Sequence, residues 1–371
     1  MLTAAIILIL IVLIAAAVYG FIRIYPPFGV PVDRSRISRF EQSEHYRQGK
    51  FQNRIPTQSI DSSIRSFYSL FADHLKNNPK RRPPHELPVL NPNLGSLTAA
   101  ETDSVTWLGH SSVLLKLGGK NLLLDPMLGM HSSPLPGFGA KRFKSSSQIE
   151  VKDLPRLDAV FLSHDHFDHL DYSTIQQLSG KVGRYFVPLG VGSRLVRFGV
   201  ERGLIQEFDW WGEVEWQGIR AVCTPARHFS GRALFDKDAT LWCSWVLLDP
   251  KTRVYFSGDS GYDEHFKRIG DLYGPFDLTL IECGQYDPRW EQIHMMPEQT
   301  VQAHKDLRGR RLLPIHWAGF ALAMHGWMEP VERVSEDSER RGVELLVPRI
   351  GETVSLKEEA LLPRDKWWRT V

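Results

Sequence analysis

The chain has 371 residues, with 45 Lys and Arg and 43 Asp and Glu, which give a formal net charge of +2. So small a net charge argues against a nucleic-acid-binding protein, and 42% hydrophobic with 24% charged residues is typical of a folded globular protein. At this length the chain can bury one large hydrophobic core or two modest ones.

Residues 1–22 are predicted to be a transmembrane anchor. The stretch from Leu2 to Ile22 carries no charge and is long enough to cross about 30 Å of hydrocarbon as a helix. Arg23 and further arginines follow this stretch and no basic residue precedes it, so the positive-inside rule places the main domain in the cytoplasm behind a single-pass anchor. Three consecutive alanines at 15–17 leave a cleaved signal peptide as the alternative.

Residues 23–100 are predicted to be a basic, membrane-proximal extension that packs on the core. The segment has few long apolar runs and ends in "NNPKRRPP", and basic residues near anionic headgroups contribute about 1 kcal/mol each. A solvated, partly ordered arm is the alternative. Within the extension, Ser62 to Leu75 predicts an amphipathic helix, because apolar residues recur there at helical spacing, namely Ile64, Phe67, Tyr68, Phe71 and Leu75.

Residues 101–358 contain many short apolar runs separated by Gly, Pro and Asp. The stretch "VTWLGHSSVLLKLGGKNLLLDP" predicts hairpin strands around Gly118 and Gly119. Further strands are predicted for "AVFLS", "RYFVP", "IRAVCTP", "LWCSWVLLD", "RVYFSGD", "LTLIECG" and "LLPIHWAG". Helices are predicted over Ser173–Leu178, Gly190–Phe198 and Pro297–Leu307. This mixture predicts an α/β protein with two sheets covered by helices.

The stretch "FLSHDHFDHLD" places a cluster of metal-binding residue types directly after a predicted strand. His164, His166, Asp168 and His169 spell H-x-H-x-D-H. Alternate residues of extended backbone share a face, so His164 and His166 can converge on one cation, and Asp168 and His169 after the bend can reach a second. Imidazole nitrogen with carboxylate oxygen suits Zn²⁺. One loop cannot complete two metal shells, so other strands must supply further ligands.

Further along the chain, three more residues of metal-binding type each come directly after a strand-like run. They are His228 in "CTPARHFSGR", Asp259 in "YFSGDSGYD" and His316 in "LPIHWAGF". Their residue types match the missing ligands, so we expect them to meet the H-x-H-x-D-H loop in the fold.

This ordered set of motifs resembles the metallo-β-lactamase superfamily, and the flanking phrases are similar to the branch that contains N-acyl-phosphatidylethanolamine phospholipase D. The phrases are "GKFQN", "WLGHSSVLL", "LLLDPM", "SHDHFDHLD", "PARHFSGR", "SGDSGYD", "HMMPEQ" and "IHWAGFAL". Lactonases and hydrolases of other substrates share the metal motifs. The resemblance implies an αββα sandwich, with residues 101–358 as the catalytic domain.

The resemblance also implies two zinc ions per chain. His164, His166 and His228 would hold one ion, Asp168, His169 and His316 the second, and Asp259 would bridge both. A bridging hydroxide would attack the substrate, because two cations about 3.5–4 Å apart make a shared water acidic and stabilise the attacking and leaving oxygens. Diiron members of the family place Glu where His166 stands, so hydrolysis is expected rather than redox chemistry. Iron or manganese occupancy stays open.

Three further residues are candidates for supporting roles. Asp125, which ends "NLLLDP", resembles the family's buried aspartate that orients a metal ligand, and a turn-initiating aspartate is the alternative. The resemblance places His294 near the substrate, where it could donate a proton to the leaving group or bind a phosphoryl oxygen; a structural histidine is the alternative. His110 in "WLGHSS" either faces the floor of the site or is structural. Asp168, Asp259 and His294 are the predicted catalytic residues.

Two features outside the motifs also carry expectations. Cys223, Cys243 and Cys283 are odd in number and far apart, which predicts buried free thiols and favours a reducing compartment. The C-terminal tail, residues 359–371, contains "KWWR", whose tryptophans Trp367 and Trp368 either lie at the membrane interface or pack against the domain.

Together these features predict a membrane-anchored dinuclear zinc hydrolase that cleaves a phosphodiester, such as the headgroup bond of a phospholipid. A lactonase or another small-molecule hydrolase is one alternative, and a non-catalytic metal-binding scaffold is a second. The expected partners are the lipid bilayer and a small-molecule or phospholipid substrate. Nucleic acid is not expected, because the large insertion of the nuclease branches has no counterpart here. Homodimer formation is left open.

Overall fold

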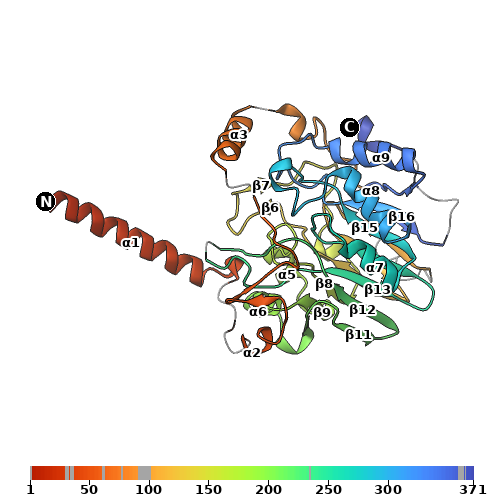
Figure 1. Ribbon diagram of the computed structural model, residues 1–371, viewed down its shortest axis with the longest axis horizontal. Coiled ribbons are helices and arrows are strands. Elements are labelled where there is room, and N and C mark those ends of the chain that lie inside the picture. The colour runs from red at the N-terminus through yellow and green to blue at the C-terminus, as the bar shows by residue number, and fades with distance from the viewer. Residues whose placement is uncertain are drawn as a thin grey trace.

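A computed structural model describes every residue except 1, 30–32, 34–36, 61–62, 77, 91–101, 234, 358–362 and 364. A long helix, α1 (Leu2–Ile24), projects away from the body of the protein (Figure 1). Most of its described side chains are exposed and apolar. Among the described residues there is one helix, Thr3–Ile24, that is long enough and apolar enough to cross a membrane. The predicted apolar helix is therefore present.

The body contains two mixed sheets of seven strands each. Their strand orders are β10-β9-β8-β5-β4-β3-β18 and β11-β12-β13-β14-β15-β16-β17. The first sheet comprises β3 (Ser104–Trp107), β4 (Val113–Leu117), β5 (Lys120–Leu124), β8 (Leu157–Phe161), β9 (Val182–Pro188), β10 (Ile205–Phe208) and β18 (Thr353–Ser355). The second comprises β11 (Glu213–Trp216), β12 (Ile219–Thr224), β13 (Ser244–Leu248), β14 (Arg253–Phe256), β15 (Phe276–Glu282), β16 (Gly309–Ile315) and β17 (Glu344–Leu345).

The pairing directions bring several strand ends to one edge of the sandwich. Strands β5, β8 and β9 are parallel, and so are β14, β15 and β16. The predicted hairpin joins β4 to β5 with Leu117 opposite Lys120, and both turn glycines, Gly118 and Gly119, have positive φ as a type I′ turn requires. Because β3 and β12 run antiparallel to β4 and β13, their carboxyl ends also face this edge. Loops that follow these strands can therefore meet.

Helices cover the outer faces of both sheets and complete an αββα sandwich (Figure 1). Helix α6 contacts β9 and β10, whereas α8 contacts β15 and β16 and lies beside α7 and α9. The sequence predicted α5, α6 and α8 but not α7 or α9. Their bounds are α5 (Tyr172–Gln177), α6 (Val191–Arg197), α7 (His265–Tyr273), α8 (Pro297–Asp306) and α9 (Glu329–Arg341).

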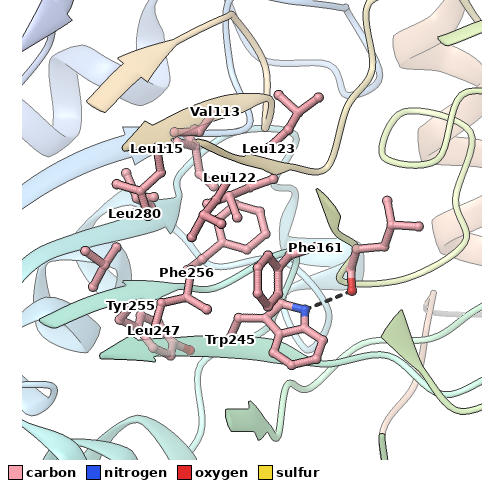
Figure 2. Packing of buried hydrophobic residues seen from close by; sticks show 14 of the residues in the cluster. Val113, Leu115, Leu122, Leu123, Phe161, Trp245, Leu247, Tyr255, Phe256 and Leu280 are labelled. Carbon is pink, nitrogen blue, oxygen red and sulfur yellow. Dashed lines mark hydrogen bonds between the residues drawn. The ribbon is translucent and has the colours of Figure 1, made fainter. Parts of the chain in front are cut away.

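The core lies between the two sheets. Phe161 of β8 and Trp245 of β13 pack edge to face with ring centroids 5.1 Å apart (Figure 2). Burying a side chain such as Phe161 contributes about 1.5–3 kcal/mol. The indole Nε1 of Trp245 donates a hydrogen bond to the carbonyl of Leu162 at 2.9 Å. Since Leu162 opens the H-x-H-x-D-H loop, the core fixes where this loop begins.

The extension packs partly into this core. Phe40 of α2 (Ile37–Phe40) and Phe51 of β2 (Lys50–Phe51), which pairs with β1 (Tyr46–Arg47), are each 1% exposed. Helix α3 (Ile64–Leu75) forms where predicted, with the Ser63 hydroxyl accepting a hydrogen bond from the Ser66 amide. The side chains of Ile64, Phe67, Phe71 and Leu75 lie outside the described residues. The domain limits stay predictions, and those at 100/101 and 358/359 fall within residues that are not described.

The C-terminal tryptophans belong to the packed interior. Trp367 and Trp368 are 1% and 2% exposed, and the Trp367 ring stacks 5.7 Å from that of Trp317. The Trp368 indole donates a hydrogen bond to the Glu332 carboxylate at 2.5 Å. The packed tail was therefore the correct alternative, and the interfacial one was wrong. The three cysteines are buried free thiols, as predicted.

Candidate metal centre

The H-x-H-x-D-H loop turns sharply between β8 and α5. The amides of His169 and Leu170 donate hydrogen bonds to the carbonyl of His166, at 3.2 and 2.8 Å. The loop ends at Asp171, whose carboxylate accepts from the Thr174 amide and caps α5. Asp171 therefore terminates the loop, whereas the residues before it face the edge where the strand ends converge.

One group of side chains contains His164, His166, His228 and Asp259. The Nδ1 atom of His166 lies 2.9 Å from His164 Nε2 and 3.3 Å from His228 Nε2. Asp259 Oδ2 lies 3.8 Å from the Nε2 atoms of both His164 and His228. All four offered ligand atoms lie within 4.8 Å of one another, close enough to surround one cation.

A second group contains Asp168, His169, His316 and a residue with no firm assignment from sequence, His110. Asp168 Oδ2 lies 3.5 Å from His169 Nε2, 3.2 Å from His316 Nε2 and 3.0 Å from His110 Nε2. The same Asp259 Oδ2 that faces the first group lies 3.0 Å from His169 Nε2 and 3.3 Å from His316 Nε2. The two groups therefore meet at one carboxylate oxygen, and all seven predicted ligands are brought together.

Three of the histidine rings have a partner at the outer nitrogen, Nδ1, that fixes the ring's orientation. His169 Nδ1 lies 2.7 Å from Asp125 Oδ2, His164 Nδ1 lies 2.8 Å from the Ser163 hydroxyl, and His228 Nδ1 lies 2.9 Å from the Ile293 carbonyl. Each Nε2 atom is left to face the centre. Asp125 also accepts hydrogen bonds from the Ser163 amide and hydroxyl, so it orients two neighbouring residues of the site.

Backbone strain collects at the same place. His110, Asp125 and His316 have positive φ values of 53°, 38° and 67°. Non-glycine residues in this region cost of order 1–3 kcal/mol each and persist where the surroundings hold them, commonly at functional sites. The strain therefore marks the ends of β3, β5 and β16 as parts of a functional site.

The three histidines of the first group are neutral imidazoles. Burial lowers the pKa of His164 and His228 well below its usual value and also lowers the pKa of His166. Neutral rings keep a free lone pair, which a metal ion requires.

The second group is held together by opposite charges. Burial alone would raise the pKa of Asp168 and Asp259, but the charge of His169 together with the other adjacent histidines outweighs this effect and holds both pKa values well below their usual range. The two carboxylates in turn raise the pKa of His169 well above its usual value and that of His316 to about 10, against the effect of burial. Such protons are released when a cation takes their place.

Buried atoms without hydrogen-bond partners indicate that these residues form a cation site. Among the described residues, His169 Nε2 and Asp259 Oδ1 are buried atoms without a hydrogen-bond partner. Buried polar atoms are rarely left in this state unless an ion or ligand satisfies them. The donor set of imidazole nitrogens and carboxylate oxygens is the set that zinc prefers, so these residues fit a divalent metal pair.

Sequence reasoning missed Glu282, the last residue of β15. Its fully buried carboxylate lies 2.9 Å from His294 Nδ1 and 3.4 Å from His316 Nδ1, and accepts from the Ser260 and Met295 amides at 3.1 Å. The ring of His294 itself lies 5.2 Å from that of His316. The feature of the sequence that could have identified Glu282 is a carboxylate directly at the end of an apolar, strand-like run.

A cavity of about 530 Å³ borders the first group at His228. The extension forms one side of it through residues 51–57. Asn53 is tied to His228, donating to its carbonyl at 2.7 Å and accepting from its amide at 3.2 Å. Two cationic side chains, Arg47 and Lys237, also line the cavity. The Lys237 ammonium lies 5.5 Å from the Phe229 ring centroid, and this ring lies 4.5 Å from the ring of His166.

Comparisons with known proteins agree with this architecture. The model of the beta-lactamase superfamily domain matches residues 120–317. A Mycobacterium tuberculosis protein without an assigned function is 39% identical over 89% of this chain and 88% of its own length. The N-acyl-phosphatidylethanolamine-hydrolyzing phospholipase D 1 of Caenorhabditis elegans is 33% identical over 67% of this chain and 74% of its own length. A Klebsiella pneumoniae outer membrane protein, RomA, is 50% identical over 29% of this chain and 86% of its own length.

A solved structure shows the same fold. The metallo hydrolase Igni18 of Ignicoccus hospitalis aligns with a TM-score of 0.53 and 23% identity, over 70% of this chain and all of that one. The fold, the residue clusters and the relatives define a metal-dependent hydrolase. The chain belongs to the metallo-β-lactamase superfamily, as its motifs predicted.

Proposed function

We propose that this protein is a membrane-anchored dinuclear zinc hydrolase that cleaves a phosphodiester in the manner of a phospholipase D. The observation that carries the proposal is the meeting of the two residue groups at Asp259 Oδ2, which lies 3.0 Å from His169 Nε2 and 3.8 Å from His164 Nε2. A shared carboxylate between two sets of nitrogen ligands is the arrangement that a pair of cations requires.

The distances support the predicted division of ligands. One zinc is assigned to His164, His166 and His228, the second to Asp168, His169 and His316, and Asp259 to both. His110 stays outside this set, because its Nε2 contacts Asp168 Oδ2 at 3.0 Å and so orients that carboxylate. Two bound zinc ions would supply an acidic water and stabilise the charge that develops in an in-line displacement.

His294 is proposed to donate a proton to the leaving group. Its Nδ1 atom lies 2.9 Å from the buried Glu282 carboxylate, which can accept that N–H and stabilise the imidazolium charge. The opposite nitrogen, Nε2, is then the atom that carries the transferable proton. The ring lies beside those of His316 and His228, at 5.2 and 5.1 Å between centroids, so it is within reach of a substrate held at both groups.

The cavity beside His228 supports an anionic substrate. Arg47 and Lys237 line it and have no ion pair among the interactions described, whereas the third lining cation, Arg54, pairs with Asp263 at 3.3 Å. Asp238 is the one acidic residue of the lining. The excess positive charge beside the metal centre favours a phosphodiester over a neutral lactone.

The position of the anchor supports a lipid substrate. Phe235 is 78% exposed, and its ring lies 6.2 Å from that of Tyr19 near the end of α1. Lys237, two residues further on, lines the cavity. The rim of the cavity therefore adjoins the anchor. A cytoplasmic location of the domain follows from Arg23 and the positive-inside rule, and remains part of the proposal together with the lipid bilayer as partner.

An activity panel tests the function. The full chain in lipid nanodiscs, loaded with zinc, would be assayed with N-acyl-phosphatidylethanolamine, phosphatidylcholine, a bis-aryl phosphodiester and lactones, beside the Asp259→Asn variant and the exposed-site control Asp271→Asn. We expect phosphodiester cleavage that Asp259→Asn abolishes and Asp271→Asn retains. Turnover of lactones alone would establish the lactonase alternative, and zinc binding without turnover of any substrate would favour the scaffold.

A further inference from the structure

The chain that follows α1 is held by two buried arginines of the catalytic domain. Arg232 donates from Nε and Nη2 to the carbonyl of Pro27, at 3.0 and 2.8 Å. Arg194 donates from Nη1 to the carbonyl of Gly29 at 2.6 Å. The two arginines are 4% and 0% exposed. The segment from Pro26 to Gly29 is thus fastened to the domain and is not a free linker.

The same two guanidinium groups hold the H-x-H-x-D-H loop. Arg232 Nη1 donates to the carbonyls of Asp165 and Leu170, at 2.6 and 2.8 Å, and these two residues flank the ligands from His166 to His169. The guanidinium also lies 4.1 Å from the ring centroid of Phe167 inside the loop. Arg194 Nε pairs with Asp165 Oδ2 at 3.1 Å. Each arginine therefore bridges the segment after the anchor and the metal-binding loop.

Asp165 extends this connection to the other ligand segment. Its Oδ1 atom accepts a hydrogen bond from the Gly231 amide at 2.9 Å, three residues after His228. Asp236 completes the group, pairing with Arg194 Nη2 at 2.7 Å and accepting from the Arg232 amide at 3.0 Å. Two arginines thus face two aspartates out of water, and disturbing one of them leaves buried charge without a partner.

We propose that Arg194 and Arg232 are positioning residues that make segment 26–29, the chain just after the anchor, part of the metal centre, so that zinc affinity depends on how this segment is seated. The inference rests on the proposed zinc sites. Contacts behind metal ligands commonly change metal affinity by about 10- to 100-fold. A planar guanidinium holds five donors in a rigid fork, whereas the ammonium of lysine offers three donors from a single point and cannot reach the same set of partners in the same directions.

Glycine substitutions test the connection from the anchor side. A Cβ on Gly29, which has φ of +68°, would lie 2.7 Å from Arg194 Cδ, whereas a Cβ on Gly20 within α1 would meet nothing within 4 Å. Zinc affinity of the full chain in nanodiscs would be measured by competition with a chromophoric chelator. We expect Gly29→Ala to bind zinc about 10-fold more weakly than wild type, and Gly20→Ala to bind it within about twofold of wild type.

Arginine variants test the connection from the domain side. Arg232→Lys is expected to weaken zinc binding by about 10- to 100-fold. Arg197→Lys is the matched control, because Arg197 contacts the carbonyl of Ile24 at the end of α1 but no residue of the metal loop among its described contacts. Circular dichroism shows whether each variant is folded. If Arg232→Lys does not fold, the zinc affinity of Gly29→Ala tests the positioning role.

The outcomes separate this inference from the proposed function. If wild type binds two zinc ions, and Gly29→Ala and Arg232→Lys bind zinc as tightly as wild type does, the positioning role alone is overturned. Fewer than two zinc ions bound by wild type would overturn the dinuclear proposal and the inference with it. Equal losses in Arg197→Lys and Arg232→Lys would assign the effect to anchoring in general, which also overturns the inference.

Discussion

Asp125 Oδ2 lies 2.7 Å from His169 Nδ1, with both side chains fully buried. The same carboxylate also accepts hydrogen bonds from the Ser163 amide and hydroxyl, at 2.7 and 2.5 Å. Its position at the end of β5 thus fixes the tautomer of one predicted zinc ligand and the backbone beside His164. The resemblance-based role of Asp125 as an orienting residue agrees with this geometry, and the turn role is insufficient to explain it.

The first prediction concerns Asp125. Asp125→Asn keeps the size of the side chain but removes the charge that stabilises His169, so we expect zinc affinity to fall about 10- to 100-fold. Chelator competition followed by metal analysis of the purified full chain measures the change. Asp158→Asn, which alters a half-buried aspartate of β8 remote from the loop end, is the control. Unchanged affinity in Asp125→Asn would contradict the orienting role.

The second prediction concerns the proton donated by His294. His294→Gln should lower kcat for a phosphodiester with an alkyl leaving group by about 100-fold or more, because general acid catalysis contributes at least this much. A nitrophenyl leaving group needs no protonation, so the loss with that substrate should be much smaller. Glu282→Gln should show the same dependence on leaving group to a lesser degree. Equal losses with both substrates would indicate that His294 and Glu282 only shape the site.

Much of the fold could be predicted because the strands of this family are buried on both faces. Runs such as the one that forms β13 are almost continuously apolar and stand out from the loops. β11 was missed because its four residues alternate exposed glutamates with half-buried Val214 and Trp216, which gives too short a pattern. α9 was missed because its buried face includes Ser335, Asp337 and Ser338, so its apolar stripe is narrow.

The metal groups were predictable because their residue types are rare and cluster after strands. Glu282 was not predictable, because in the sequence it is only the last residue of an apolar strand. Its place in the site depends on the parallel pairing of β15 and β16, which brings it beside His316. Asp165 stands among the ligands of the loop in the sequence, and only the fold shows its ion pair with Arg194, 29 residues further along the chain. Such contacts depend on distances that spacing in the sequence does not encode.

The third prediction concerns the charge of the cavity. Lys237→Ala should raise KM for an anionic phosphodiester by about fivefold, since one exposed charge contributes up to about 1 kcal/mol, with kcat little changed. The exposed Lys251, in the turn between β13 and β14, provides the control Lys251→Ala. Steady-state kinetics at low and high salt measure the effect. The difference in KM between wild type and Lys237→Ala should shrink at high salt. A salt-independent loss would indicate packing against Phe229 instead.

The fourth prediction concerns stability in acid. Burial lowers the pKa of His304 in α8 to about 4, and its Nδ1 lies 2.7 Å from the Thr279 hydroxyl of β15. Lys305, the charged neighbour on the same helix, lowers it further. In the unfolded chain a histidine titrates near 6.5. As the pH falls below 6.5, the unfolded chain binds a proton that the folded protein excludes, so stability declines until about pH 4 and the loss is complete below it.

The His304→Gln variant should therefore be less sensitive to acid than wild type. At pH 5 the buried histidine costs wild type about 2 kcal/mol relative to pH 8, from the difference between the two pKa values. The decrease in the free energy of unfolding between pH 8 and pH 5 should be smaller by that amount in the variant. Lys305→Arg keeps the neighbouring charge and should follow wild type. Denaturant unfolding of the full chain at both pH values measures the difference, and parallel decreases in wild type and His304→Gln would show that His304 is not the group responsible.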